Sequence, residues 1–125
     1  MIILCLGNEF VKNDSFAIKV SDELSKSSKD IEIIKIKDSF QLIEALRRDR
    51  DLIILDVVEG INDIKILKIE DLRFDSIVTA HDFDAGFVLK LFGEGKRIKI
   101  IGIPMDGDIE TIKNKIIEIL SKNLF

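Results

Sequence analysis

The sequence predicts an α/β domain in which a mostly parallel sheet of about five strands lies between two layers of helices. Short apolar runs bounded by charged and turn residues recur along the chain, and segments with a single apolar stripe separate them. Such runs are typical of parallel strands that are buried on both faces and connected by helices. No internal repeat, linker or low-complexity segment divides the 125 residues. We therefore expect one domain over residues 1–125, a three-layer α/β/α sandwich that allows one antiparallel strand at an edge.

The predicted strands are of two kinds. Those buried on both faces are residues 2–6, 31–36, 52–58 and 98–103, and Pro104 ends the last of them. Residues 64–69 instead alternate Ile-Lys-Ile-Leu-Lys-Ile, which is typical of a strand with one solvated face at a sheet edge. Residues 76–80 form a short apolar run that fits either a strand end or a loop.

Helices are predicted between these strands. The first begins at Asp14 or Ser15, both good N-cap residues, and runs to about Ser27 with one apolar stripe. The others are expected after a cap at Ser39, over residues 83–92 before Gly93, and after a cap at Asp108. Strands that alternate with helices in this way favour a parallel sheet covered on both faces.

Composition limits the classes of function. The net charge of −4 disfavours a nucleic-acid partner, and no apolar stretch is long enough to cross a membrane. Cys5 is the only cysteine and lies inside an apolar strand pattern, so a buried inert thiol is expected rather than a reactive one. We expect a cytoplasmic protein and favour a monomer.

One acid, Asp56, stands inside a buried strand pattern within residues 51–60. An ionised carboxylate in the middle of an apolar core costs several kcal/mol unless it is paired. We therefore expect the third strand to end at Asp56, with the carboxylate at the carboxyl edge of the sheet. Open α/β sheets bind their ligands at that edge.

Two further polar residues are predicted at the same edge. Asp14 follows the first strand, and His81, the only histidine, lies in the loop after residues 76–80. Two carboxylates and one imidazole, with coordination positions left open, suit a divalent transition metal that meets a substrate. Each residue also has an ordinary interpretation: Asp14 as a helix N-cap, Asp56 as a strand-end acid, and His81 as a structural or surface residue.

Four short segments share a further pattern, in order along residues 2–104. They are GNEFVKNDSFA at 7–17, LDVVEG at 55–60, TAHDF at 79–83 and IIGI at 100–103. The first is similar to the opening motif Gly-Asn-x-Leu-x-x-Asp-[Asp/Glu]-Gly-x-Gly of the hydrogenase maturation endopeptidases. The second resembles that family's third-strand motif, the third falls where the family has Ser/Thr-Pro-His, and the last resembles its Ile-Gly-Ile/Val strand. The chain therefore resembles this family over most of its length.

The resemblance implies a definite function. Family members remove a short carboxyl-terminal extension from the large subunit of nickel–iron hydrogenases after nickel insertion, and they recognise the nickel in the precursor. Carried over by position, the catalytic and nickel-contacting residues are Asp14, Asp56 and His81. The metal is then nickel supplied by the substrate, for which another divalent metal can be a surrogate, and the partner is the hydrogenase large-subunit precursor.

Two alternatives stay open. Residues 51–56 with 76–80 also resemble the third and fourth strands of response-regulator receiver domains, in which Asp56 would accept a phosphoryl group. Two differences speak against this alternative. Gly7-Asn8 stands where receiver domains carry the acidic pair that binds magnesium, and Ile103 rather than a lysine comes directly before Pro104. The other alternative is an inactive binding relative of either family, because Asn13, Ser15 and Ala17 depart from the maturation motif.

Overall fold

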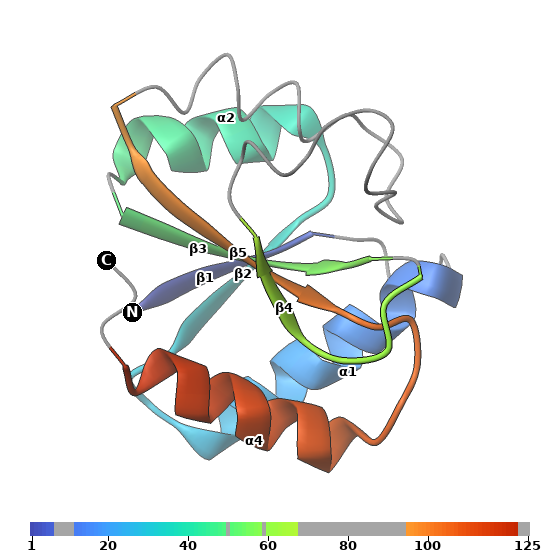
Figure 1. Ribbon diagram of the computed structural model, residues 1–125. Coiled ribbons are helices and arrows are strands. Elements are labelled where there is room, and N and C mark those ends of the chain that lie inside the picture. The colour runs from blue at the N-terminus through green and yellow to red at the C-terminus, as the bar shows by residue number, and fades with distance from the viewer. Residues whose placement is uncertain (7–11, 50, 59, 68–94, 123–125) are drawn as a thin grey trace.

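The computed structural model describes residues 1–6, 12–49, 51–58, 60–67 and 95–122, with the backbone alone for residues 12–15. Figure 1 shows the elements and gives their labels. In chain order they are β1 (Ile2–Leu6), α1 (Lys12–Ser27), β2 (Glu32–Ile36), α2 (Ser39–Arg48), β3 (Asp51–Val57), β4 (Lys65–Leu67), β5 (Arg97–Ile103) and α4 (Ile109–Leu120).

The strands form one five-stranded sheet in the order β2-β1-β3-β5-β4. The first four strands of this order pair in parallel, whereas β4 pairs antiparallel with β5 at the sheet edge. In β4, Lys65 and Ile66 are exposed, Ile66 at 43%, whereas Leu67 is 1% exposed. The predicted mixed sheet, with an antiparallel strand at one edge, is therefore confirmed.

Helices cover both faces of this sheet (Figure 1). The cluster on the α2 face contains Leu4, Leu6, Ile36, Leu42, Ala45, Leu46, Leu52, Ile54, Val58, Leu67, Ile98 and Ile100. The cluster on the face of α1 and α4 contains Ile3, Cys5, Phe16, Ala17, Val20, Leu24, Ile53, Leu55, Val57, Ile101, Ile103, Ile112 and Ile116. Each fully buried Leu or Ile contributes about 1.5–3 kcal/mol of transfer free energy, so both layers are needed to hold the sheet. The three-layer α/β/α prediction is confirmed.

The ends of two helices are set by aspartates. Asp108 is the N-cap of α4 as predicted, and its carboxylate accepts a hydrogen bond from the Thr111 N–H at 3.2 Å. In α2 the N-cap is Asp38 rather than Ser39, because the Asp38 carboxylate accepts from the Gln41 N–H at 3.0 Å. The cap prediction for α2 was therefore wrong by one residue, and the carboxylate is the acceptor that the helix uses.

The start of α1 also differs from the prediction. The helix begins at Lys12, so Asp14 lies inside its first turn and is not its N-cap. An acid within the first turn is still favourable there, because the helix dipole leaves partial positive charge at that end. The apolar stripe of Phe16, Val20 and Leu24 is buried as expected.

Some predictions fall on residues that the structure does not describe. These are the strand or loop at residues 76–80, the helix over residues 83–92, and His81. In the described parts of the chain, no helix has the length and apolar character needed to cross a membrane.

Candidate functional site

Asp56 lies one residue before the end of β3 and is 2% exposed. The sequence had suggested that the strand ends at Asp56, but the strand continues past this residue. Val57 pairs with Ile103 of β5, and the Val58 N–H then donates to the Ile103 carbonyl at 2.9 Å. The pairing with β5 therefore continues beyond Asp56, and the Asp56 side chain is buried near the carboxyl ends of the strands.

The neighbour of Asp56 on β5 is a glycine. Asp56 is in register with Gly102, whose position would direct a side chain toward Val58 and Leu67. A Cβ at Gly102 would lie 3.0 Å from the Val58 Cγ2 atom and 3.4 Å from the Leu67 Cδ1 atom. Val58 and Leu67 therefore pack closely over this part of β5 because residue 102 has no side chain.

The strand order places Asp56 at the switch point of the sheet. β1 and β3 are parallel neighbours, with Cys5 in register with Leu55. After β1 the chain turns to one side and forms β2, and it later returns to form β3 on the other side of β1. Ligands bind at such points in open α/β sheets, beyond the carboxyl ends of the strands. The expectation that the first and third strands are neighbours is confirmed.

The first turn of α1 lies at this same edge, because the helix follows the carboxyl end of β1. The Phe16 ring is 3.8 Å from the position of a Cβ on Gly107, in the loop that follows β5. The start of α1 and the end of β3 are thus at one edge of the sheet (Figure 1). The structure describes neither the Asp14 side chain nor His81, so the predicted meeting of the three residues stays a prediction.

Metal-ligating residues do not form a group of three in the described parts of the chain. Of the predicted set, only the Asp56 side chain belongs to those parts. Two carboxylates and one imidazole remain a chemically suitable donor set for a divalent transition metal.

Cys5 is buried next to this region and cannot act as a nucleophile at neutral pH. The pKa of its thiol is raised to about 12, mainly by burial and also by the negative charge of Asp56, whereas a hydrogen bond with Ser21 acts to lower it. The thiolate is the reactive form of cysteine, and almost none is present at pH 7. The expected inert thiol is supported.

Other acids at the carboxyl edge have local roles. Asp63, between β3 and β4, accepts a hydrogen bond from the Lys115 ammonium at 2.8 Å, and this bond lowers the pKa of its carboxyl. Hydrogen bonds from Thr111 lower the pKa of Asp108. These carboxylates are exposed and stabilise local structure, so they differ from Asp56.

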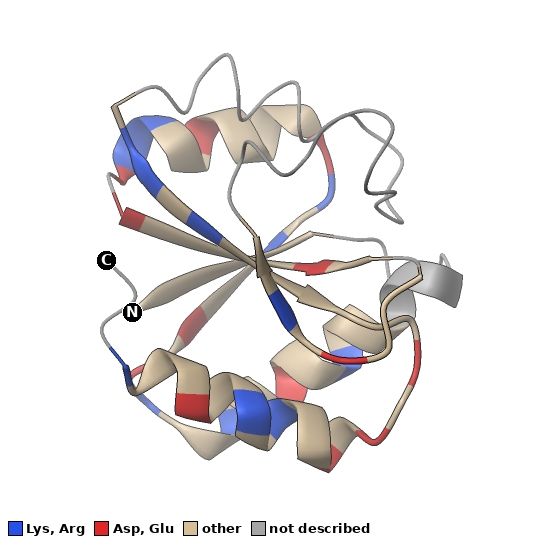
Figure 2. Ribbon diagram, viewed as in Figure 1, with Lys and Arg blue, Asp and Glu red and all other residues tan. Residues whose placement is uncertain are grey.

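The opposite edge of the sheet, where the parallel strands begin, carries basic residues. Basic residues occupy the last turn of α2 and the start of β5, as Figure 2 shows. Lys96 donates to the Asp49 carbonyl at 3.0 Å, and Arg97 forms an ion pair with Asp51 at 2.6 Å. These two basic groups therefore bind the start of β3 and the loop before it, within the chain.

Comparisons with known proteins bear on the fold. No family model and no curated protein sequence matches the chain. An uncharacterized protein from Wolinella succinogenes has a similar structure, with a TM-score of 0.64 and 16% sequence identity over 96% of each chain. The hydrogenase 2 maturation peptidase from Thaumarchaeota archaeon SCGC_AB-539-E09 is also similar, with a TM-score of 0.53 and 17% identity over 95% of this chain and 94% of that one. At these identities the likeness establishes the fold.

Proposed function

We propose that this protein is an endopeptidase that removes the carboxyl-terminal extension of a nickel–iron hydrogenase large-subunit precursor after nickel insertion. The observation that carries the proposal is Asp56, an acid that is 2% exposed at the switch point of the sheet. By the resemblance of the LDVVEG segment, it corresponds to the family's third-strand acid. The likeness to a hydrogenase maturation peptidase in fold adds support.

Burial of the Asp56 carboxylate costs free energy that its interactions within the protein have to offset. Transfer of an ionised carboxylate from water to a protein interior costs several kcal/mol, and a protein that needed only stability would carry an apolar residue here. Leu52 and Ile54, the other side chains of β3 on the α2 face of the sheet, are apolar. An acid retained at the ligand-binding edge favours a role in recognition or catalysis.

In the proposed site, Asp14, Asp56 and His81 hold the nickel that arrives in the precursor. Carboxylate and imidazole donors bind a soft-leaning divalent metal weakly by themselves, and the thiolates of the precursor complete its coordination. Recognition then depends on nickel insertion, because an empty precursor offers no cation to these residues. A metal next to the scissile carbonyl can also polarise it or lower the pKa of a bound water.

Two features weigh against the receiver alternative. Receiver domains have the parallel strand order 2-1-3-4-5, whereas β4 here is antiparallel and lies outside β5. The acidic pair and the lysine that receivers use with magnesium and the phosphoryl group are also missing from the corresponding positions of this chain.

The direct test is a cleavage assay. The protein is incubated with nickel-loaded large-subunit precursor and, separately, with nickel-free precursor, and the products are weighed by mass spectrometry. We expect loss of the extension from the nickel-loaded precursor alone. Substitutions Asp14→Ala, Asp56→Ala and His81→Ala should each reduce the cleavage rate on the order of a hundredfold or more, as removal of a group that acts in the transition state does.

Asp106→Ala is the matched control, because Asp106 is an exposed acid in the loop after β5 at the same edge. It should cleave at the wild-type rate. If all three site variants also cleave at that rate, the assignment of the site is wrong. If the wild-type protein leaves the nickel-loaded precursor intact, and a small phosphodonor with magnesium adds a phosphoryl group to Asp56, the receiver interpretation replaces this one.

A further inference from the structure

The chain passes over the carboxyl end of β5 in the connection between β3 and β4, residues 60–64 (Figure 1). The strand order places β3 on one side of β5 and β4 on the other, so the connection has to cross this end of the strand. Ile61 packs against the core cluster on the α2 face, and Ile64 packs against the cluster on the face of α1 and α4. The connection is therefore anchored on both faces of the sheet.

The strands that this connection joins both lie beside Gly102. Asp56 of β3 and Lys65 of β4 are each in register with Gly102 of β5, from opposite sides. The Val58 Cγ2 atom and the Lys65 carbonyl oxygen lie 3.0 and 3.4 Å from the position of a Cβ on Gly102. A displacement of residues 60–64 would therefore move groups that pack next to Asp56.

An ion pair joins the outer part of the connection to α4. The Asp63 Oδ1 atom accepts hydrogen bonds from the Lys115 ammonium and from the Ile64 N–H, both at 2.8 Å. One carboxylate oxygen thus links the helix to the backbone of the residue that precedes β4. The hydrogen bonds from Lys115 and Ile64 lower the pKa of the Asp63 carboxyl, so this residue is ionised at neutral pH.

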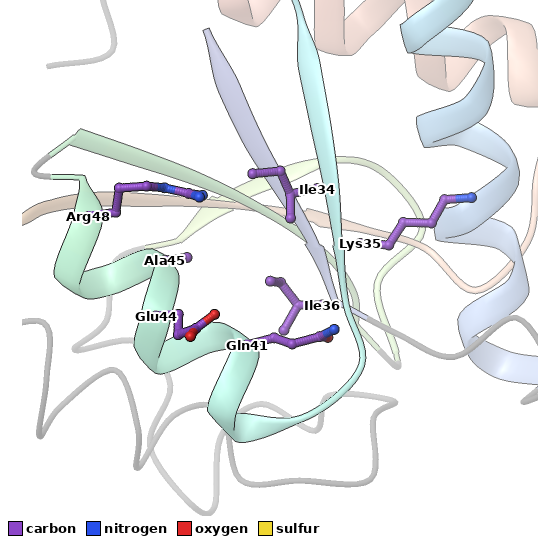
Figure 3. Close-up of a pocket in the computed structure, with 7 residues that line it drawn as sticks. All are labelled: Ile34, Lys35, Ile36, Gln41, Glu44, Ala45 and Arg48. Atoms are coloured by element: carbon purple, nitrogen blue, oxygen red, sulfur yellow. The ribbon is translucent and has the colours of Figure 1, made fainter.

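Two other ion pairs in the described parts of the chain join distant elements, and both join regular elements that pack into the core. Lys35 of β2 pairs with Asp22 of α1 at 3.1 Å, and Arg97 of β5 pairs with Asp51 of β3 at 2.6 Å. Figure 3 shows Lys35, which borders a small groove of about 190 Å³ between β2 and α2, extending toward α1. The pair at Asp63 differs from both, because it holds a connection that has no regular structure.

We propose that Asp63 and Lys115 are positioning residues, which hold residues 60–64 in the arrangement that the hydrogenase precursor binds; this inference rests on the function proposed above. The connection follows the strand of Asp56 and borders the edge at which open α/β sheets bind ligands. The Lys115 and Asp63 side chains are 44% and 63% exposed, and an exposed ion pair contributes little to the stability of a domain. Loss of the pair should therefore affect the site and leave the fold intact.

The expected size of this effect follows from the exposure of the pair. An exposed ion pair shifts a local opening equilibrium about two- to fivefold. The apparent affinity for a ligand falls with the fraction of molecules that have the competent arrangement. We therefore expect KM for the nickel-loaded precursor to rise roughly two- to fivefold when the pair is lost. The value of kcat should not change, because saturating precursor draws all molecules into the competent arrangement.

The experiment compares hydrogen exchange and cleavage in the same variants. Lys115→Gln and Asp63→Asn remove the pair, and Asp63→Asn keeps an oxygen that can accept from the Ile64 N–H. Amide hydrogen exchange of residues 60–64 is measured in the free protein, and KM and kcat are measured by mass spectrometry of the cleaved precursor. We expect faster exchange and a raised KM in both variants. The double variant should match each single variant, since both substitutions remove one interaction.

Two kinds of control match these variants. Lys115→Arg keeps the positive charge, so exchange and KM should stay at the wild-type values. Lys35→Gln and Asp22→Asn make the same chemical changes in an ion pair of similar exposure that lies outside the β3–β4 connection. They should leave KM, kcat and the exchange of residues 60–64 unchanged. Urea denaturation should give the same midpoint for the wild-type protein and for every variant, within the scatter of repeat measurements.

The outcomes separate this inference from the proposed function. Unchanged exchange in Lys115→Gln and Asp63→Asn overturns the positioning of residues 60–64, whether or not the precursor is cleaved. Faster exchange with a wild-type KM leaves the proposed function in place and overturns the role of the connection in precursor binding. A lower denaturation midpoint together with a lower kcat would assign the pair to the stability of the fold instead. If the wild-type protein does not cleave the precursor, the proposed function falls and the role in precursor binding falls with it.

Discussion

β3 carries an aspartate near each end, and the two residues are in opposite environments. The Asp51 side chain is 45% exposed at the amino end, and its carboxylate accepts hydrogen bonds from Arg97 at 2.7 and 2.6 Å. Asp56 is 2% exposed near the carboxyl end and faces a glycine on β5. Exposed ion pairs contribute little to stability, whereas a buried carboxylate is costly. The comparison teaches that position and burial, rather than residue type, distinguish a candidate site residue from a surface acid.

The largest expected difference between the two ends is in activity. Asp56→Asn keeps the shape of the side chain and removes its charge, so cleavage of nickel-loaded precursor should fall roughly a hundredfold or more. Asp51→Asn, the same change at the other end of the strand, should leave the rate at the wild-type level. Rates are measured by mass spectrometry of the product. Equal losses in the two variants would remove the distinction between the two ends of β3.

A second difference concerns packing next to Asp56. Gly102→Ala places a Cβ 3.0 Å from the Val58 Cγ2 atom, and overpacking of this kind lowers the free energy of unfolding by about 1–3 kcal/mol. Urea denaturation measures the change. Gly60→Ala is the control for backbone strain without crowding, since Gly60 has φ of +83° and no atom within 4 Å of its Cβ position. Wild-type stability in Gly102→Ala would show that Val58 and Leu67 move aside easily.

The smallest effect on stability is expected for a substitution at the amino end of β3. Asp51→Asn weakens the ion pair with Arg97, which is exposed on both sides and screened by solvent. The denaturation midpoint should therefore stay within the scatter of repeat measurements, at low and at high salt. A clear loss of stability that disappears at high salt would show that the amino edge of the sheet depends on this pair.

The regular parts of the fold could be predicted from local patterns. The edge position of β4 followed from the Ile-Lys alternation, and the cap at Asp108 followed from a carboxylate three residues before Thr111. Both features are determined by neighbouring residues, so the sequence contains the information directly. The stripe on α1 was predictable for the same reason, although the helix starts at Lys12 rather than near Asp14.

Features that depend on distant residues were harder to predict. The apolar pattern predicted a strand over residues 52–58, but the cost of burying Asp56 suggested that pairing stops at that residue. The structure agrees with the pattern, because β5 continues to pair with Val57 and Val58. The proximity of Gly102 to Asp56 and the groove between β2 and α2 arise from strand register and helix packing. Neither produces a local pattern, although a glycine inside a strand is a signal of close approach.

The central claim is that the carboxylates at the carboxyl edge contact the nickel of the precursor. X-ray absorption at the nickel edge, on the nickel-loaded precursor alone and in complex with the protein, tests it most directly. Binding should add oxygen or nitrogen neighbours at about 2.0–2.2 Å from the metal, the distance typical of carboxylate and imidazole ligands. Asp56→Asn should lose part of that signal, whereas Asp51→Asn should keep it. A spectrum that does not change when the wild-type protein binds would contradict the claim.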